Sequence, residues 1–110
     1  MSLERIFKAL IDLGLSETDA QVYIYLATKG PAKARNIIHN LTITERQTYH
    51  SLKRLQNRSI IIANDKHPIE FSALPFEEVL DMLIEMKQEQ AQAIKKRRKE
   101  LLSTWLNNRK

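Results

Sequence analysis

Apolar residues recur at helical spacing through the first forty residues of the chain. The first such stretch, residues 3–13, ends before Gly14, and glycine is common after the last turn of a helix because it tolerates a left-handed backbone. Ser16 is a predicted N-cap for a second helix, with Asp19 as a weak capping-box partner. A third, short helix is predicted over residues 32–40. The pattern therefore predicts three short helices before residue 41.

A fourth helix is predicted over residues 45–57. Thr44 is suited to cap it, and Gln47 occupies the third helical position, where it completes a capping box. The other positions are polar or basic, apart from a narrow apolar stripe made of Tyr49, Leu52 and Leu55. We expect this stripe to anchor the helix, and Tyr49 to lie in the core or touch the backbone rather than read a base.

After the fourth helix the pattern changes. Residues 59–63 are rich in β-branched side chains, and residues 69–73 alternate between apolar and polar, as half-buried strands do. A cluster of turn-forming residues separates them, so a β-hairpin with a charged tip is predicted. Beyond Pro75, residues 76–107 contain no glycine or proline and predict one long helix.

Short helices followed by a hairpin within 75 residues are the order of a winged helix-turn-helix. The predicted fold class is therefore α+β, mainly α with a small β-hairpin, with a winged helix-turn-helix domain at 1–75 and a long dimerisation helix at 76–110. In such a fold one helix enters the DNA major groove while the preceding helix braces it. Residues 45–57 are the predicted groove helix and residues 32–40 the brace.

The charge distribution agrees with this interpretation. The segment 32–58 holds six basic residues and one acid, which equals the net charge of +5 of the whole chain. Neutralisation of DNA phosphates would use this excess. Because arginine favours guanine edges and glutamine adenine edges, we predict that Arg46 and Gln47 read bases.

The remaining predicted contacts position the protein on DNA. Phosphate contacts are expected from Lys33, Arg35, Lys53, Arg54 and Arg58. Thr44, Glu45 and His50 complete the predicted DNA-facing set on the fourth helix. Lys66 and His67 at the hairpin tip are candidate contacts to an adjacent groove or phosphate, although a plain turn role suits His67 better.

Other chemistry is poorly supported. The chain has no cysteine and two separated glycines, which leaves no thiolate site and no glycine-rich phosphate loop. His39, His50 and His67 lack the paired spacing of metal ligands. We predict no enzyme activity, no catalytic residue, no metal and no cofactor. No signal peptide or membrane span is recognisable, so a cytoplasmic, nucleoid-associated protein without a membrane partner is expected.

Three segments resemble the N-terminal DNA-binding domain of the TrmB-like transcriptional regulators: LGLSETDAQVYIYLATKGPAKARNII, ITERQTYHSLKRLQNRSII and EFSALPFEEVL. The resemblance covers residues 13–80 and implies a winged helix, double-stranded DNA as ligand and a dimeric regulator. It also places residues 44–47 and His50 in the recognition region and residues 65–67 in the wing.

Two residues depart from the family pattern. Ser59 stands where glycine is common, and Lys33 stands where a small capping hydroxyl is common. Larger members of the family carry a C-terminal sugar-binding domain. Because this sequence stops at Lys110, no such domain is expected and sugar sensing is not carried over.

The long C-terminal helix offers a dimer contact. Its apolar residues form two stripes separated by polar residues 87–92, which does not predict a sustained coiled coil. We expect one part to pack on the first helix and another to pair with a second chain, with predicted dimer contacts at Leu83, Met86, Ile94, Leu101, Leu102 and Trp105. Five consecutive bases at 95–99 form either a solvated face or a contact to DNA phosphates or an acidic partner.

Together these features predict a transcriptional regulator that binds duplex DNA as a dimer. Two alternatives remain open at this stage: a sequence-neutral architectural chromatin protein, and a winged-helix module that binds another protein.

Overall fold

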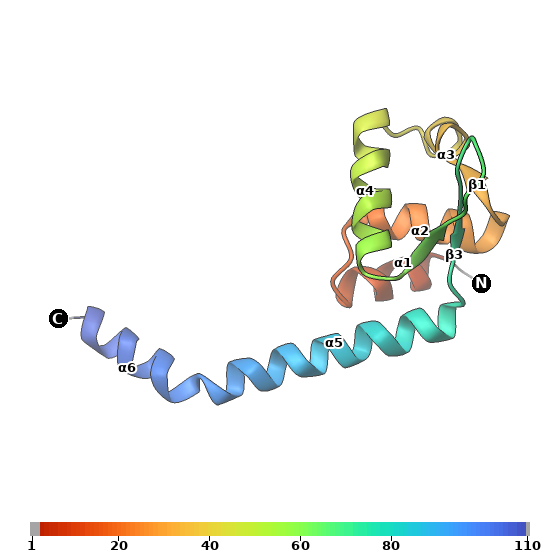
Figure 1. Cartoon of the computed structure of the whole chain (residues 1–110). Coiled ribbons are helices and arrows are strands. Elements are labelled where there is room, and N and C mark those ends of the chain that lie inside the picture. Colours follow the sequence, from red (N-terminus) through yellow and green to blue (C-terminus); the bar gives the residue numbers. More distant parts are fainter. Residues whose placement is uncertain (1–2, 110) are drawn as a thin grey trace.

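Four helices in the first half of the chain form where the hydrophobic pattern predicts them. The computed structural model describes residues 3–109. The helices are α1 (Leu3–Asp12), α2 (Glu17–Lys29), α3 (Ala34–Leu41) and α4 (Glu45–Asn57) (Figure 1). Gly14 has φ +107°, and Ser16 caps α2 by accepting the Asp19 N–H at 3.1 Å. The prediction for the Asp19 side chain is wrong, because its carboxylate bonds to α4 instead of to the start of its own helix.

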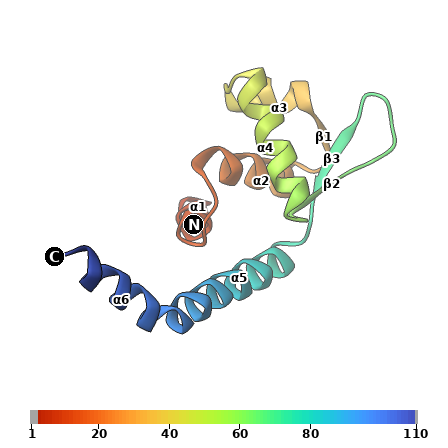
Figure 2. The same ribbon diagram turned by 60° about the vertical axis from the view of Figure 1, so that its left-hand side comes forward.

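The predicted hairpin forms and is joined by a third strand. The strands are β1 (Ala32–Lys33), β2 (Ile61–Ala63) and β3 (Glu70–Ala73), in the antiparallel order β1-β3-β2. β1 was not predicted, and α3 consequently begins at Ala34. At the start of the hairpin loop the Asn64 side-chain oxygen accepts the N–H groups of Lys66 and Glu70, which organises a wing that projects from the domain (Figure 2).

A single core joins the helices to the sheet. It includes Tyr23 and Leu26 from α2, Ile37 from α3 and Phe71 from β3. The side of α4 that faces this core carries Thr48, Ser51, Leu52 and Leu55. The prediction that Tyr49 lies in this stripe is wrong, since 51% of its surface is exposed. The four buried positions follow i, i+3, i+4, i+7 spacing, and Tyr49 lies one position outside it.

The C-terminal region forms two helices instead of the predicted one. α5 (Phe76–Lys96) and α6 (Arg98–Asn108) meet at Arg97, where φ −93° and ψ 2° interrupt the helical backbone. Val79 and Leu83 are buried in the same core as Leu10 of α1, so the core extends two turns beyond Pro75.

The rest of α5, with α6, projects from the domain as an arm, and the molecule measures 58 × 29 × 28 Å (Figure 1). None of the residues 84–109 is buried. Within residues 3–109 no helix combines the length and the apolar character that crossing a membrane requires.

Candidate nucleic-acid interface

The start of α4 is held by a reciprocal capping box, as predicted. The Thr44 hydroxyl accepts the N–H of Gln47 at 3.0 Å, and the Gln47 side-chain oxygen accepts the N–H of Thr44 at 3.0 Å. Thr42 precedes this cap with φ +53°, which turns the chain sharply from α3 into α4. The N-terminal turn of α4 is therefore capped within the chain, and the Gln47 oxygen is already engaged in that cap.

The outward face of α4 is polar and basic. Arg46, His50 and Lys53 follow i, i+4, i+7 spacing on the side opposite the buried stripe, and all three are exposed. Thr44, Glu45 and Gln47 are exposed at the N-terminus of the same helix. Because buried Leu52 and Leu55 anchor the opposite side, α4 presents these polar groups to solvent.

A groove of about 470 Å³ lies between the start of α3, α4 and the wing. Residues distant in sequence meet there: Lys33 and Arg35 from the start of α3, Tyr49 from α4, and His67 from the wing. Ala34, Pro68, Ile69 and Phe71 complete the lining. The sequence prediction included Lys33 and Arg35 of this groove and missed Tyr49, whose outward position follows from the burial of Thr48 and Ser51.

Arg54 behaves differently from the other predicted phosphate contacts. Its Nε and one terminal nitrogen donate to the two carboxylate oxygens of Asp19 at 3.0 and 2.8 Å, and the Ser51 hydroxyl donates to the same carboxylate at 2.6 Å. Asp19 is only 3% exposed. Hydrogen bonding to Asp19 raises the pKa of Arg54 above its ordinary value, with their charge attraction adding to the rise and burial opposing it. The phosphate contact of Arg54 stays a prediction.

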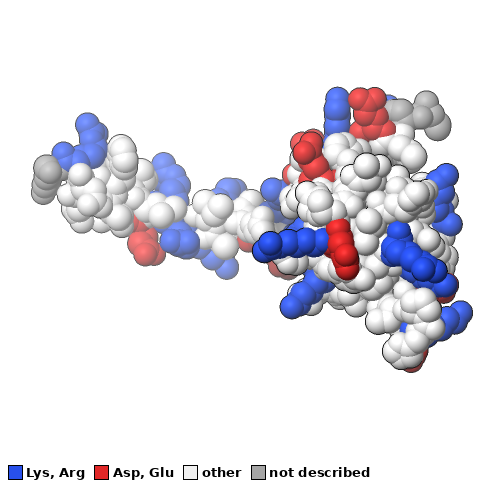
Figure 3. Space-filling view, turned by 90° about the horizontal axis from the view of Figure 1, so that it is seen from above, with Lys and Arg blue, Asp and Glu red and all other residues white. Residues whose placement is uncertain are grey.

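The wing and the arm carry the remaining basic residues. The Lys66 ammonium lies 3.8 Å from a Glu70 carboxylate oxygen, and this surface pair contributes little to stability. Arg58 is partly exposed at the end of α4, and residues 95–99 are exposed around the α5–α6 break. Figure 3 shows lysine and arginine side chains over the domain face seen from above and also along the arm. Basic charge is thus present at both ends of the molecule.

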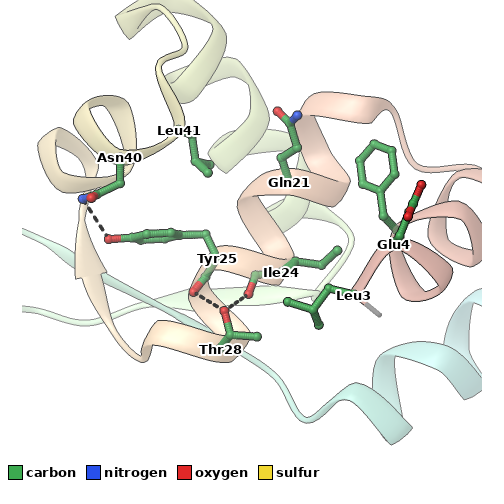
Figure 4. A pocket seen from close by; sticks show the side chains of 9 residues that line it. Leu3, Glu4, Gln21, Ile24, Tyr25, Thr28, Asn40 and Leu41 are labelled. Atoms are coloured by element: carbon green, nitrogen blue, oxygen red, sulfur yellow. Dashed lines mark hydrogen bonds between the residues drawn. The ribbon is translucent and has the colours of Figure 1, made fainter. Parts of the chain in front are cut away.

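A second, open surface pocket of about 520 Å³ lies between α1, α2 and α3 (Figure 4). Its wall is mainly apolar, with Leu3, Ile24 and Leu41 among the lining residues. The Asn40 amide donates to the Tyr25 hydroxyl at 3.2 Å, so these polar groups are partnered within the chain. Among residues 3–109, no group of three or more His, Cys, Asp or Glu side chains is arranged to hold a metal ion.

The helix pair α3–α4, the capped outward helix and the adjacent wing define the chain as a winged helix-turn-helix protein. The sequence profile of a family described as "Sugar-specific transcriptional regulator TrmB" matches residues 10–77. The chain belongs to this family of DNA-binding transcription regulators, which confirms the resemblance seen in the sequence. No curated protein sequence matches it.

Solved structures share the fold at low sequence identity. TrmBL2, an archaeal chromatin protein, is 22% identical with a TM-score of 0.76, and the match covers 94% of this chain but 42% of TrmBL2. A protein from Sulfolobus tokodaii is 15% identical with a TM-score of 0.69, over 86% of this chain and 99% of that one. A possible transcriptional regulator from Methanosarcina mazei Go1 is 12% identical with a TM-score of 0.66, over 86% and 87%. These likenesses confirm the winged-helix fold.

Proposed function

We propose that this chain regulates transcription by binding duplex DNA as a dimer, with the N-terminal half of α4 in the major groove. The observation that carries the proposal is the outward row of Arg46, His50 and Lys53 on a helix anchored by its opposite side. A major groove is wide enough for one helix, and such a row would face its floor and edges. The groove beside α4 adds Lys33 and Arg35 within reach of a phosphate backbone.

The residues divide into base readers and phosphate contacts. Arg46 is the proposed guanine reader, because its guanidinium is exposed at the first turn of α4. The Gln47 side-chain oxygen is held in the capping box, so only its amide N–H groups are free to contact a base. Recognition of adenine through both side-chain atoms would require the capping box to open. The proposed phosphate contacts are Lys33, Arg35, Lys53 and Arg58, with Lys66 and His67 reaching from the wing.

The test is selection of bound duplexes from a randomised pool, followed by fluorescence anisotropy at several salt concentrations. Arg46→Ala is expected to lose about 1–3 kcal/mol of discrimination at one base pair. Lys53→Ala is the matched control and should weaken selected and random duplexes equally. Absence of salt-sensitive duplex binding by the unsubstituted chain refutes the proposal. Equal competition by random DNA would instead identify a sequence-neutral chromatin protein.

The dimer is proposed because the arm leaves its apolar side chains exposed. α6 has eleven residues and buries none of them, and an isolated helix of that length is marginal in water. Its large apolar side chains are exposed, with Trp105 at 62%. Operators are commonly palindromic, so a second copy of the chain is the partner whose symmetry fits. The exposed apolar residues of this surface are Ile94, Leu101, Leu102, Trp105 and Leu106. Met86 of α5 is partly buried and packs against the domain core.

Leu83 was predicted from the sequence as a dimer contact, but its side chain lies elsewhere. It is fully buried in the core of its own chain, which leaves its side chain no surface for a partner. Sedimentation of the free protein tests the rest of the surface, and Trp105→Ala is expected to shift the monomer–dimer equilibrium toward monomer. Ile62→Ala removes a similarly exposed apolar side chain, at 55%, from the wing strand and should leave the equilibrium unchanged. A monomeric unsubstituted chain would refute the dimer.

A further inference from the structure

A three-residue network fastens the proposed groove helix to α2. The buried carboxylate of Asp19 accepts hydrogen bonds from Ser51 and, through both of its oxygens, from Arg54. Ser51 and Arg54 are three positions apart, so both lie along the edge of α4 that faces α2. Two attachment points on one helix edge oppose rotation of that helix about its own axis.

The network also sets Arg54 apart from the other cations of α4. Arg54 lies between the buried stripe and the outward row, instead of in line with Arg46, His50 and Lys53. Its bidentate contact uses Nε and one terminal nitrogen, a geometry that makes an arginine–carboxylate pair strong and specific. Because Asp19 is only 3% exposed, few other groups can reach its carboxylate to balance the charge. The pair is therefore close to neutral toward an approaching phosphate.

We propose that Asp19 is a positioning residue for DNA recognition, which withholds the charge of Arg54 from the phosphates and fixes the rotation of α4 about its axis. The proposal rests on duplex binding through α4, as proposed above. It reassigns Arg54 from the phosphate-contacting set to the internal support of the groove helix. The Asp19 carboxylate would then orient Arg46, His50 and Lys53 toward DNA without contacting DNA itself.

The salt dependence of binding distinguishes this role from a merely structural one. The logarithm of the binding constant falls with the logarithm of salt concentration, with a slope that steepens by about 0.9 for each phosphate neutralised. Asp19→Asn keeps the shape of the side chain and releases the charge of Arg54, so the slope should steepen by about 0.9 per bound chain. In the double variant D19N/R54Q the net charge is restored, and the slope should equal that of the unsubstituted chain.

Lys53→Gln is the matched control, since Lys53 is exposed and adjacent to Arg54. It should make the slope shallower by about 0.9 per bound chain. The preference for selected over random duplex should fall about fivefold or more in both Asp19 variants, the lower end of what one bidentate base contact supplies, and stay unchanged in K53Q.

Two results overturn the proposal. One is a D19N/R54Q slope as shallow as that of K53Q, which would make Arg54 an ordinary phosphate contact. The other is an unchanged duplex preference in both Asp19 variants. Thermal unfolding monitors the fold of each variant, and if D19N alone fails to fold, the comparison of D19N/R54Q with K53Q decides. An unsubstituted chain without salt-sensitive binding instead refutes the proposed function, so the two failures are distinguishable.

Discussion

Replacing Tyr23 with phenylalanine is expected to weaken the junction between the winged-helix domain and its arm. The Tyr23 hydroxyl donates to the Leu74 carbonyl at 2.7 Å, which joins α2 to the segment between β3 and α5. The ring is almost fully buried, at 1% exposure. The substitution keeps the ring in the core and removes only the hydroxyl, so the loss measures this one hydrogen bond.

The expected magnitude follows from the cost of a partly buried carbonyl without its donor. One net hydrogen bond contributes about 1 kcal/mol, and a fully buried unpaired carbonyl costs up to about 3 kcal/mol. Leu74 is half-buried, which places Tyr23→Phe at about 1–2 kcal/mol of lost unfolding free energy. At the average unfolding entropy per residue, a chain of this length loses about 4 °C in Tm for each kcal/mol.

The pH dependence supplies an independent check. Burial raises the pKa of Tyr23 above its ordinary value of 10.0, because the core disfavours the phenolate. The unfolded chain then ionises this tyrosine first, so its contribution to stability is fully present below pH 10 and is lost as pH rises through the folded-state pKa. The advantage of the unsubstituted chain over Tyr23→Phe should therefore shrink above pH 10.

Urea unfolding at fixed protein concentration, at pH 7, 9 and 11, measures both effects. Concentration is held constant because a dimer makes apparent stability depend on it. A difference below about 0.5 kcal/mol at pH 7, or one that stays constant from pH 9 to pH 11, would contradict the structural argument.

Three further substitutions test local backbone features. Ser59 has φ +60°, so Ser59→Gly should relieve about 1–2 kcal/mol of left-handed strain. Glycine also gives the unfolded chain more entropy, which offsets part of this gain, so the urea midpoint should rise by the equivalent of about 0.5–1 kcal/mol. Ser59→Ala should give no gain. Lys33 caps α3 without a side-chain hydrogen bond, so Lys33→Ser should add up to about 1 kcal/mol of stability. The same substitution should make the salt slope of DNA binding shallower. A variant that gains stability with a steeper salt slope, or loses stability with a shallower one, would contradict this. Thr44→Ala removes the cap of α4 and should cost about 1 kcal/mol in the same melts, with an unchanged melt excluding a stabilising capping box.

Local sequence signals predicted the elements that depend on neighbouring residues. The Thr44–Gln47 capping box needs only three-residue spacing, and it appears as predicted. The hairpin follows from alternation and turn residues in the same way. Ser59 was recognised as a departure from a common glycine, and its positive φ gives the physical reason.

Tyr49 shows why the buried face of α4 was misread. An apolar stripe through Tyr49, Leu52 and Leu55 ignores small polar residues, whereas the buried face uses Thr48 and Ser51 at helical spacing. The Thr48 hydroxyl donates to the Thr44 carbonyl and Ser51 donates to Asp19, which makes their burial favourable. Hydrophobicity alone could not have identified these two positions.

Features made by contacts distant in sequence had no local signal. Arg54 and Asp19 are 35 residues apart, and β1 is two residues long, formed only because β3 pairs with it. The interruption at Arg97 contains neither glycine nor proline, so nothing in the residue types marked it. Such features depend on how the elements assemble and require coordinates.

Because Val79 and Leu83 lie in the same core as Leu52 and Leu55 of α4, the first two turns of α5 and the groove helix are fixed to one another. If the arms of two copies pair in the proposed dimer, the protein sets both the distance between the two groove helices and their relative rotation about the DNA axis. Duplexes whose half-sites are displaced by half a helical turn, about five base pairs, would then present the second site on the wrong side of the DNA.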